Sequence, residues 1–153
     1  MGKFVHLHTH SHYSLLDGLA KIDDLVGRTK ELGMDSIALT DHGVLYGAIE
    51  FYKKAKKAGI RPILGVEAYM APKGRRDKEP GERYYNLVLL CENLTGWKNL
   101  IKLVSIANLE GYYYKPRIDK EILRQYHEGL IGLSACLSGE VNRHLMAVRF
   151  EDA

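Results

Sequence analysis

Short apolar runs alternate with stretches of helical periodicity along the chain. Five apolar runs predict strands. They span residues 4–8, 36–40, 62–70, 87–91 and 130–134. Four stretches between them predict helices. They span residues 22–32, 44–58, 97–109 and 118–126. Gly33 and Gly59 are suitable stop residues for the first two helices, and Asp119 is a plausible N-cap for the last. This alternation predicts α/β architecture with a largely parallel sheet.

The composition is that of a globular chain. Its 153 residues are 46% hydrophobic and 27% charged, which allows one good core, so we predict one domain over residues 1–153. The formal net charge of +3 is too small to indicate a dedicated nucleic-acid-binding face, although it is compatible with a phosphate-bearing partner. No apolar run approaches the roughly 20 residues that span a bilayer, and the N-terminus lacks a signal-peptide core. We therefore expect a cytoplasmic protein with no membrane partner.

Cysteine usage agrees with that expectation. Cys91 and Cys136 are the two cysteines, and both lie in apolar, strand-like settings. Two cysteines cannot build a disulfide framework. We expect two free thiols.

Histidines at alternate positions are the main chemical signal near the N-terminus. They are His6, His8, His10 and His12. In an extended segment all four can project to one side, and neutral imidazole is the commonest transition-metal ligand. A solvated, histidine-rich terminus is the alternative. The hydroxyls and the carboxylate that follow, up to Asp17, disfavour that alternative because they do not continue the histidine repeat.

Metal-competent groups recur where predicted strands end. They are His8 and His10, then Asp41 and His42, then Glu67, and finally Cys136. Functional groups gather at the carboxyl ends of strands in α/β barrels and open parallel sheets. Taken singly, Glu67 could be a buried acid satisfied by backbone amides, and Cys136 a small core residue. Taken together, the set predicts a site for two or three Zn or Mn ions that hydrolyses a phosphoester.

Two further segments combine cations with other signals. The loop over residues 71–83 mixes both charges, and we interpret it as a solvated connection; a basic flap on nucleic acid is the alternative. Its cations are Lys73, Arg75, Arg76, Lys78 and Arg83. The run YYYKPR at residues 112–117 could stack bases, but ordinary packing after a helix is the favoured interpretation.

Three ordered motifs resemble the polymerase and histidinol phosphatase (PHP) domain family. They are HLHTHSHYSLLDG, ALTDHGVLYGAIEFYKKAKKAGIRPILGVEAY and NLTGWKNLIKLVSIANLEGYYYKPRID. The narrower resemblance is to the version that begins the alpha subunits of bacterial DNA polymerase III. It covers nearly the whole chain. It implies an α/β fold of PHP type, a distorted seven-stranded βα barrel with a metal cluster at its mouth. About the first five strands would lie in this chain.

The resemblance also implies roles for individual residues. The implied metal ligands are His8, His10, Asp17, His42, Glu67 and Cys136. His6 and Asp41 would orient ligands. Asn86 stands where active-looking relatives place a metal-binding histidine, so one metal would bind weakly or be missing. The family's closing Asp-x-His motif does not occur before Ala153.

Two functions compete for such a domain. The first is a metal-dependent phosphoesterase that acts as a 3′ to 5′ proofreading exonuclease. The second is a structural module with a partly decayed metal site, which stabilises the polymerase and docks a separate proofreading exonuclease; Asn86 favours it. A free-standing small-molecule phosphatase is a weaker third. In the parent protein, polymerisation would use Mg in domains outside this chain, and the partners would be DNA, the sliding clamp and the exonuclease subunit.

Overall fold

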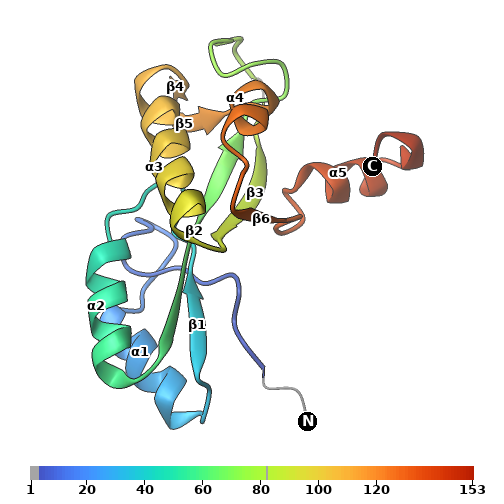
Figure 1. The fold of residues 1–153 in the computed structure, drawn as a ribbon. Coiled ribbons are helices and arrows are strands. Elements are labelled where there is room, and N and C mark those ends of the chain that lie inside the picture. The colour runs from blue at the N-terminus through green and yellow to red at the C-terminus, as the bar shows by residue number, and fades with distance from the viewer. Residues whose placement is uncertain (1–3, 82) are drawn as a thin grey trace.

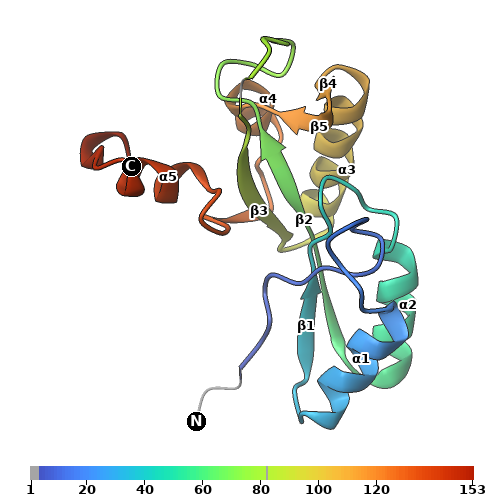
Figure 2. The same cartoon turned by 180° about the vertical axis from the view of Figure 1, so that it is seen from behind.

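The structure, a computed structural model, describes residues 4–81 and 83–153 as a mixed α/β fold around one long strand (Figures 1 and 2). That strand, β2 (Arg61–Met70), pairs in parallel with β1 (Ser36–Leu39) along its first half and antiparallel with β3 (Tyr85–Cys91) along its second. Every residue of β2 from Gly65 onwards is buried, which explains why this half of the strand is apolar except at Glu67. The predicted α/β class is confirmed.

The remaining strands extend the sheet on both sides of β2. β5 (Lys115–Ile118) pairs in parallel with the end of β2 and forms a hairpin with β4 (Tyr112–Tyr113). β6 (Leu130–Leu133) pairs antiparallel with β3 on the other side. The order among the described strands is β4-β5-β2-β3-β6, with β1 beside the first half of β2. The sheet is therefore mixed, and the prediction of a largely parallel sheet is wrong. The reason is that the chain returns from β2 to β3 without a crossover helix.

The predicted strand at residues 4–8 does not form as a regular strand. His6 makes a single parallel bridge to Ile37, and its carbonyl accepts from the Ala38 amide at 2.8 Å. Phe4 and Leu7 are 67% and 40% exposed, so burial of an apolar face does not hold this segment in the sheet. The β4–β5 hairpin was not predicted, because its strands are short and Pro116 breaks the strand pattern.

Helices cover two hydrophobic clusters along β2. α1 (Ile22–Glu31) and α2 (Ala48–Ala58) pack against β1 and the first half of β2, around Phe51 and Ile22. α3 (Leu94–Leu109) and α4 (Lys120–Gln125) pack against the second half, around Leu100 and Ile118. α5 (Glu140–Met146) and the 3₁₀ turn η1 (Phe150–Asp152) extend away from this body (Figure 1).

Capping residues explain where the helices begin and end. Asp119 accepts from the Ile122 amide at 3.0 Å, which confirms it as the N-cap of α4. Asn93 caps α3 in the same way, so this helix begins three residues before the predicted start. Gly59 ends α2 with a φ of 77°, a conformation that glycine adopts without strain. α2 itself begins at Ala48 and not at residue 44.

The described residues of the loop over residues 71–83 are mostly exposed, as the solvated interpretation predicts, but Ala71 and Arg75 are buried. Arg75 is 6% exposed, and its guanidinium donates to Asp119 at 3.0 Å and to Glu110 at 2.9 Å. Arg76 also pairs with Glu110, at 2.6 Å. These ion pairs fix the loop to α4 and to the end of α3. They engage Arg75 and Arg76, two of the five cations that a basic flap on nucleic acid would use.

Two other features of the fold bear on the predictions. Cys91 and Cys136 are both free thiols, half-buried and exposed respectively, as expected. Within residues 4–81 and 83–153, no helix is long and apolar enough to cross a bilayer.

Candidate metal centre

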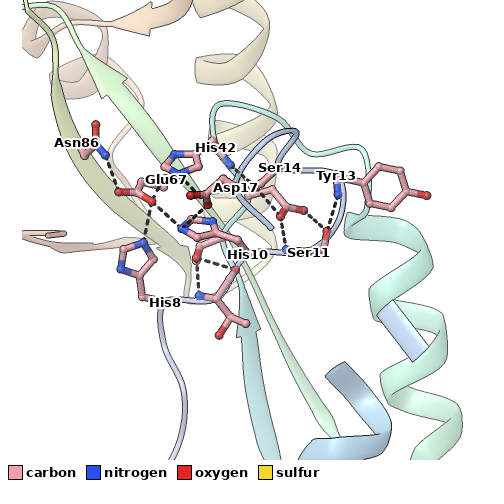
Figure 3. Close-up of polar contacts among 12 residues, drawn as sticks. His8, His10, Ser11, Tyr13, Ser14, Asp17, His42, Glu67 and Asn86 are labelled. Carbon is pink, nitrogen blue, oxygen red and sulfur yellow. Dashed lines mark hydrogen bonds and ion pairs between the residues drawn. The ribbon is translucent and has the colours of Figure 1, made fainter. Parts of the chain in front are cut away.

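Five of the predicted ligands converge beside the middle of β2 (Figure 3). His8 and His10 come from the N-terminal segment, and Asp17 comes from the turn that follows it. His42 comes from the loop after β1, directly after Asp41. Glu67 projects from β2 itself. His42 reaches Glu67 because a parallel bridge joins these two residues. The strand ends therefore bring distant residues together, as the sequence pattern predicted.

Glu67 is the hub of the cluster. It is 1% exposed, and its Oε2 atom lies 2.8 Å from His8 Nε2, 3.0 Å from His10 Nε2 and 3.4 Å from His42 Nδ1. Burial alone would raise the pKa of this carboxyl. Hydrogen bonds from the imidazoles and the charge around them outweigh burial, and they hold the pKa of Glu67 well below its ordinary value. Glu67 is thus an anion at neutral pH.

Asp17 forms a second group with the same histidines. Its Oδ2 atom lies 3.3 Å from His42 Nε2 and 3.9 Å from His10 Nε2. The rings of His10 and His42 stack with centroids 4.3 Å apart. Burial lowers the pKa of His42, whereas the hydrogen bond and charge of Glu67 raise the pKa of His10 despite its burial. His10 belongs to both groups of potential ligands, one with His8 and Glu67 and one with Asp17 and His42.

These separations fit a transition metal. Zn binds imidazole nitrogen and carboxylate oxygen at about 2.0–2.2 Å, so two ligands of one tetrahedral ion stand about 3.4 Å apart. The nitrogen-to-oxygen distances on Glu67 and Asp17, from 2.8 to 3.9 Å, lie on both sides of that value. The buried Nδ1 atoms of His10 and His42 have no hydrogen-bond partner within the described chain. Of these two atoms, Nδ1 of His42 lies beside a carboxylate, 3.4 Å from Glu67, and an imidazole nitrogen without a hydrogen-bond partner in that position is suited to a cation.

Asp41 organises the turn that carries Asp17. Its Oδ1 atom accepts from the Ser11 amide at 2.7 Å and from the Ser14 hydroxyl at 2.9 Å, and its Oδ2 atom accepts from the Ser11 hydroxyl at 2.8 Å. Ser14 Oγ in turn accepts from the His42 amide at 3.0 Å. Asp41 is 2% exposed, so these bonds lie in a protected environment. It acts on the site through two serines and not by contact with an imidazole.

The other predicted residues lie at different distances from the cluster. His6 is exposed, and its ring packs edge-on against Phe4. Cys136 is exposed after β6, and neither group of potential ligands found in the described residues includes it. Its role as a ligand stays a prediction. Asn86 is buried beside Glu67 and donates from Nδ2 to Glu67 Oε1 at 2.8 Å.

Tyr69 and the two serines are part of the site and were not predicted. The ring of Tyr69 stacks on His42 with centroids 5.7 Å apart, and burial raises the pKa of its hydroxyl to about 12. Tyr69 follows Glu67 by two residues in β2, and side chains two apart in a strand lie on one face. That periodicity could have identified it. Ser11 and Ser14 gave no comparable signal.

An open cleft of about 850 Å³ adjoins the centre. Asp17, His42 and Asn86 line one part of it, and the β4–β5 hairpin lines another. A volume in this range is typical of ligand sites, which span about 300–1,000 Å³. A substrate in the cleft would therefore lie directly against the candidate metal ligands.

The fold and the histidine-carboxylate cluster define a class of protein. The chain belongs to the PHP domain family, whose model matches residues 6–153. It is 56% identical over 99% of its length to the DNA polymerase III subunit alpha of Borreliella burgdorferi, and 48% identical over 97% to that of Thermus aquaticus. The chain spans about 13% of the length of each of these relatives.

The fold also has a counterpart among solved structures. An amidohydrolase from Chromobacterium violaceum, solved with bound sulfate and no metal, matches 68% of this chain and 33% of its own. The TM-score is 0.50 and the sequence identity is 26%. The likeness extends over about two thirds of this chain and supports the α/β fold described above.

Proposed function

We propose that the cluster is a metal-dependent phosphoesterase site that acts on DNA strands, with 3′ to 5′ exonuclease activity. The observation that carries the proposal is the convergence of three imidazoles on Glu67, two of which also approach Asp17, at metal-ligand separations. Zn or Mn, two or three ions in a complete site, would supply hydroxide near neutral pH and neutralise charge on the phosphate. The sulfate in the related amidohydrolase is consistent with an oxyanion substrate.

The residues of this chain have separate tasks in that proposal. His8, His10, Asp17, His42 and Glu67 are the proposed ligands, and Cys136 is a sixth by resemblance. The low pKa of Glu67 keeps it anionic, so a cation would not compete with a proton for this carboxylate. Asp41 holds the turn with Asp17 through Ser11 and Ser14. Tyr69 covers one face of His42 and limits its rotation.

We further propose that this chain is the N-terminal region of a bacterial replicative DNA polymerase. Identity of 42–56% to DNA polymerase III alpha subunits, over nearly the whole chain, supports it. DNA-directed DNA synthesis, a nucleotidyl transfer that uses Mg, would then belong to domains outside these residues. The expected partners are DNA, the sliding clamp and a proofreading exonuclease subunit, and the expected compartment is the cytoplasm.

The proposed phosphoesterase activity is tested by measuring bound metal and phosphodiester hydrolysis in the same variants. The full-length protein that carries this chain is compared with a His8→Ala/His10→Ala variant, and with His127→Ala as a matched control, because His127 is exposed and bonds only locally to Arg124. We expect two or more transition-metal ions per chain in the wild type and in the control, with hydrolysis of bis(p-nitrophenyl) phosphate. Both should be lost in the double variant. Absence of bound metal from the wild type would refute the proposal.

One observation favours the second candidate function, a structural module that docks a separate exonuclease. Asn86 donates to Glu67 and offers no imidazole to a metal. Restoring a histidine by Asn86→His separates the two functions. If the site has decayed, this variant gains metal and hydrolytic activity that the wild type lacks. If the site is active as it stands, the wild type already hydrolyses the diester before the substitution.

A further inference from the structure

The cleft beside the metal centre has walls that hydrolysis of a small phosphoester does not require. Tyr112 and Tyr114, on the β4–β5 hairpin, are 56% and 80% exposed. Tyr46, just before α2, is 72% exposed and lines the same cleft from a different part of the chain. Large aromatic rings left in water around a cavity are typical of ligand contact. Within the described residues, packing after the helix therefore does not bury Tyr112 or Tyr114, although the Tyr114 ring meets Tyr113 edge-on with centroids 4.6 Å apart.

Backbone conformation holds one of these rings outward. Tyr114 lies between Tyr113 and Lys115, which pair with each other across the hairpin, and its φ is 58°. This left-handed region is unfavourable for a bulky side chain and favours glycine. Leu16, which also lines the cleft, has a φ of 66° and is fully exposed. Two exposed residues in this unfavourable conformation thus line one cleft, which favours a functional constraint there.

Cations line the same cleft as these rings. Lys115, Arg83 and Arg143 line it from three separate segments. The Nζ atom of Lys115 lies 5.6 Å from the ring centre of Tyr69, which itself stacks on His42. Among the described residues that line the cleft, Asp17 is the one acid, and it belongs to the metal centre. Outside that centre, the lining is therefore positive and aromatic.

Resting on the proposed function, we infer that this cleft binds single-stranded nucleic acid, with bases stacked on Tyr112 and Tyr114 and the backbone near Lys115 and Arg143. Aromatic platforms beside a cationic track are how proteins hold unpaired strands, because every base presents a π face and every linkage a charge. A small phosphomonoester would occupy one phosphate position and would not reach the tyrosine rings. In a duplex the base faces are already stacked on one another, so they are not available to Tyr112 and Tyr114.

A comparison of two substrates tests this inference. The full-length protein is assayed on a single-stranded oligodeoxynucleotide and on bis(p-nitrophenyl) phosphate, which spans no more than the centre. In Tyr112→Ala/Tyr114→Ala, the ratio of kcat/KM for the oligonucleotide to that for the small diester should fall about tenfold or more, the effect of losing one or more stacked bases. Tyr52→Ala is the control, because Tyr52 is exposed on α2 and lies outside the cleft lining. It should leave the ratio unchanged.

A second variant separates the ring from the backbone. Tyr114→Gly removes the ring and accepts a φ of 58° without strain, so it should fold at least as well as the wild type. We expect the ratio to fall in this variant as well. An unchanged ratio in both variants would overturn the inference, as would an equal loss on both substrates, since that pattern reports damage to the metal centre.

Photocrosslinking keeps the inference testable if neither substrate is hydrolysed, the result that would refute the phosphoesterase. An oligodeoxynucleotide with 5-iododeoxyuridine is irradiated with the full-length protein, and the crosslinked peptides are identified by mass spectrometry. Crosslinks at Tyr112 or Tyr114 would support strand binding whether or not hydrolysis occurs. Their absence, with crosslinks confined to peptides outside residues 1–153, would overturn it.

Discussion

Asn86 donates a hydrogen bond of 2.8 Å to Oε1 of Glu67, the oxygen opposite the one that the three imidazoles contact. The amide thus holds the hub of the metal centre in place from a neighbouring strand, since Asn86 lies in β3 and Glu67 in β2. Oδ1 of Asn86 is buried and has no hydrogen-bond partner in the described chain. Asn86, at the position where the family resemblance implies a ligand, therefore still contacts the candidate site through its hydrogen bond to Glu67.

Asn86→Leu should weaken metal binding without abolishing it. Leucine has the same branching at Cγ, although it is larger, and it cannot donate to Glu67; loss of a group that orients a metal ligand typically costs 10–100-fold in affinity. Isothermal titration with Zn or Mn measures the change. Asn99→Leu is the control, because its amide is bonded to Glu128 far from the centre. An unchanged dissociation constant in Asn86→Leu would show that Glu67 needs no such support.

Asp41→Ala should destabilise the fold and disturb the site together. The substitution leaves three buried donors on Ser11 and Ser14 unpaired, and bonds to a charged acceptor contribute about 1.5–3 kcal/mol each, although their losses do not add fully. We expect the free energy of unfolding to fall by about 3 kcal/mol. Urea denaturation monitored by circular dichroism measures it. Asp24→Ala, at an exposed position in the first turn of α1, should change it by less than about 1 kcal/mol.

The site residues at the strand ends could be predicted from the sequence, because each lies in or just after an apolar run that predicts a strand. His42 and Glu67 each follow or lie within an apolar run, and the pairing of β1 with β2 makes them neighbours. Asp17 was different. Its place depends on a turn that Asp41 holds through two serines, a long-range arrangement that no periodicity reveals. Only the family resemblance pointed to it.

The direction of strands and of side chains was harder to predict. An apolar run does not show whether β3 is parallel or antiparallel to β2; the absence of a helical pattern between them carried that information. The tight β4–β5 hairpin turns Tyr112 and Tyr114 outward, whereas Tyr113 is half-buried with the Arg117 guanidinium over its ring. Three identical residues in a row have no pattern that could separate these environments.

The ion pairs of Arg75 predict an acid-sensitive contribution to stability. Burial opposes ionisation of Asp119, but bonds from the Arg75 and Ile122 amides and from the Arg75 side chain outweigh it, and they lower the pKa of Asp119 from its ordinary value of 3.8. Because the folded pKa is the lower one, the stabilisation is present above pH 3.8 and is lost as the pH falls through the folded pKa.

Asp119→Asn isolates that charge, because asparagine also caps helices well. We expect the variant to be less stable than the wild type by about 2 kcal/mol at pH 7, and the difference to shrink as the pH falls below 3.8. Urea midpoints measured across that range test it. A difference that does not change with pH would assign the effect to packing and not to the charge of Asp119.

The two thiols should react with iodoacetamide in a fixed order. Cys136 is exposed, whereas burial raises the pKa of Cys91 to about 11, so little thiolate forms at Cys91 near neutral pH. Peptide mass spectrometry should find Cys136 modified first. If Cys136 joins the metal centre, as the resemblance implies, saturating Zn will slow its alkylation while His8→Ala/His10→Ala removes that protection. If Cys136 is alkylated at the same rate with Zn bound, Cys136 is not a metal ligand, and the ligands are imidazoles and carboxylates alone.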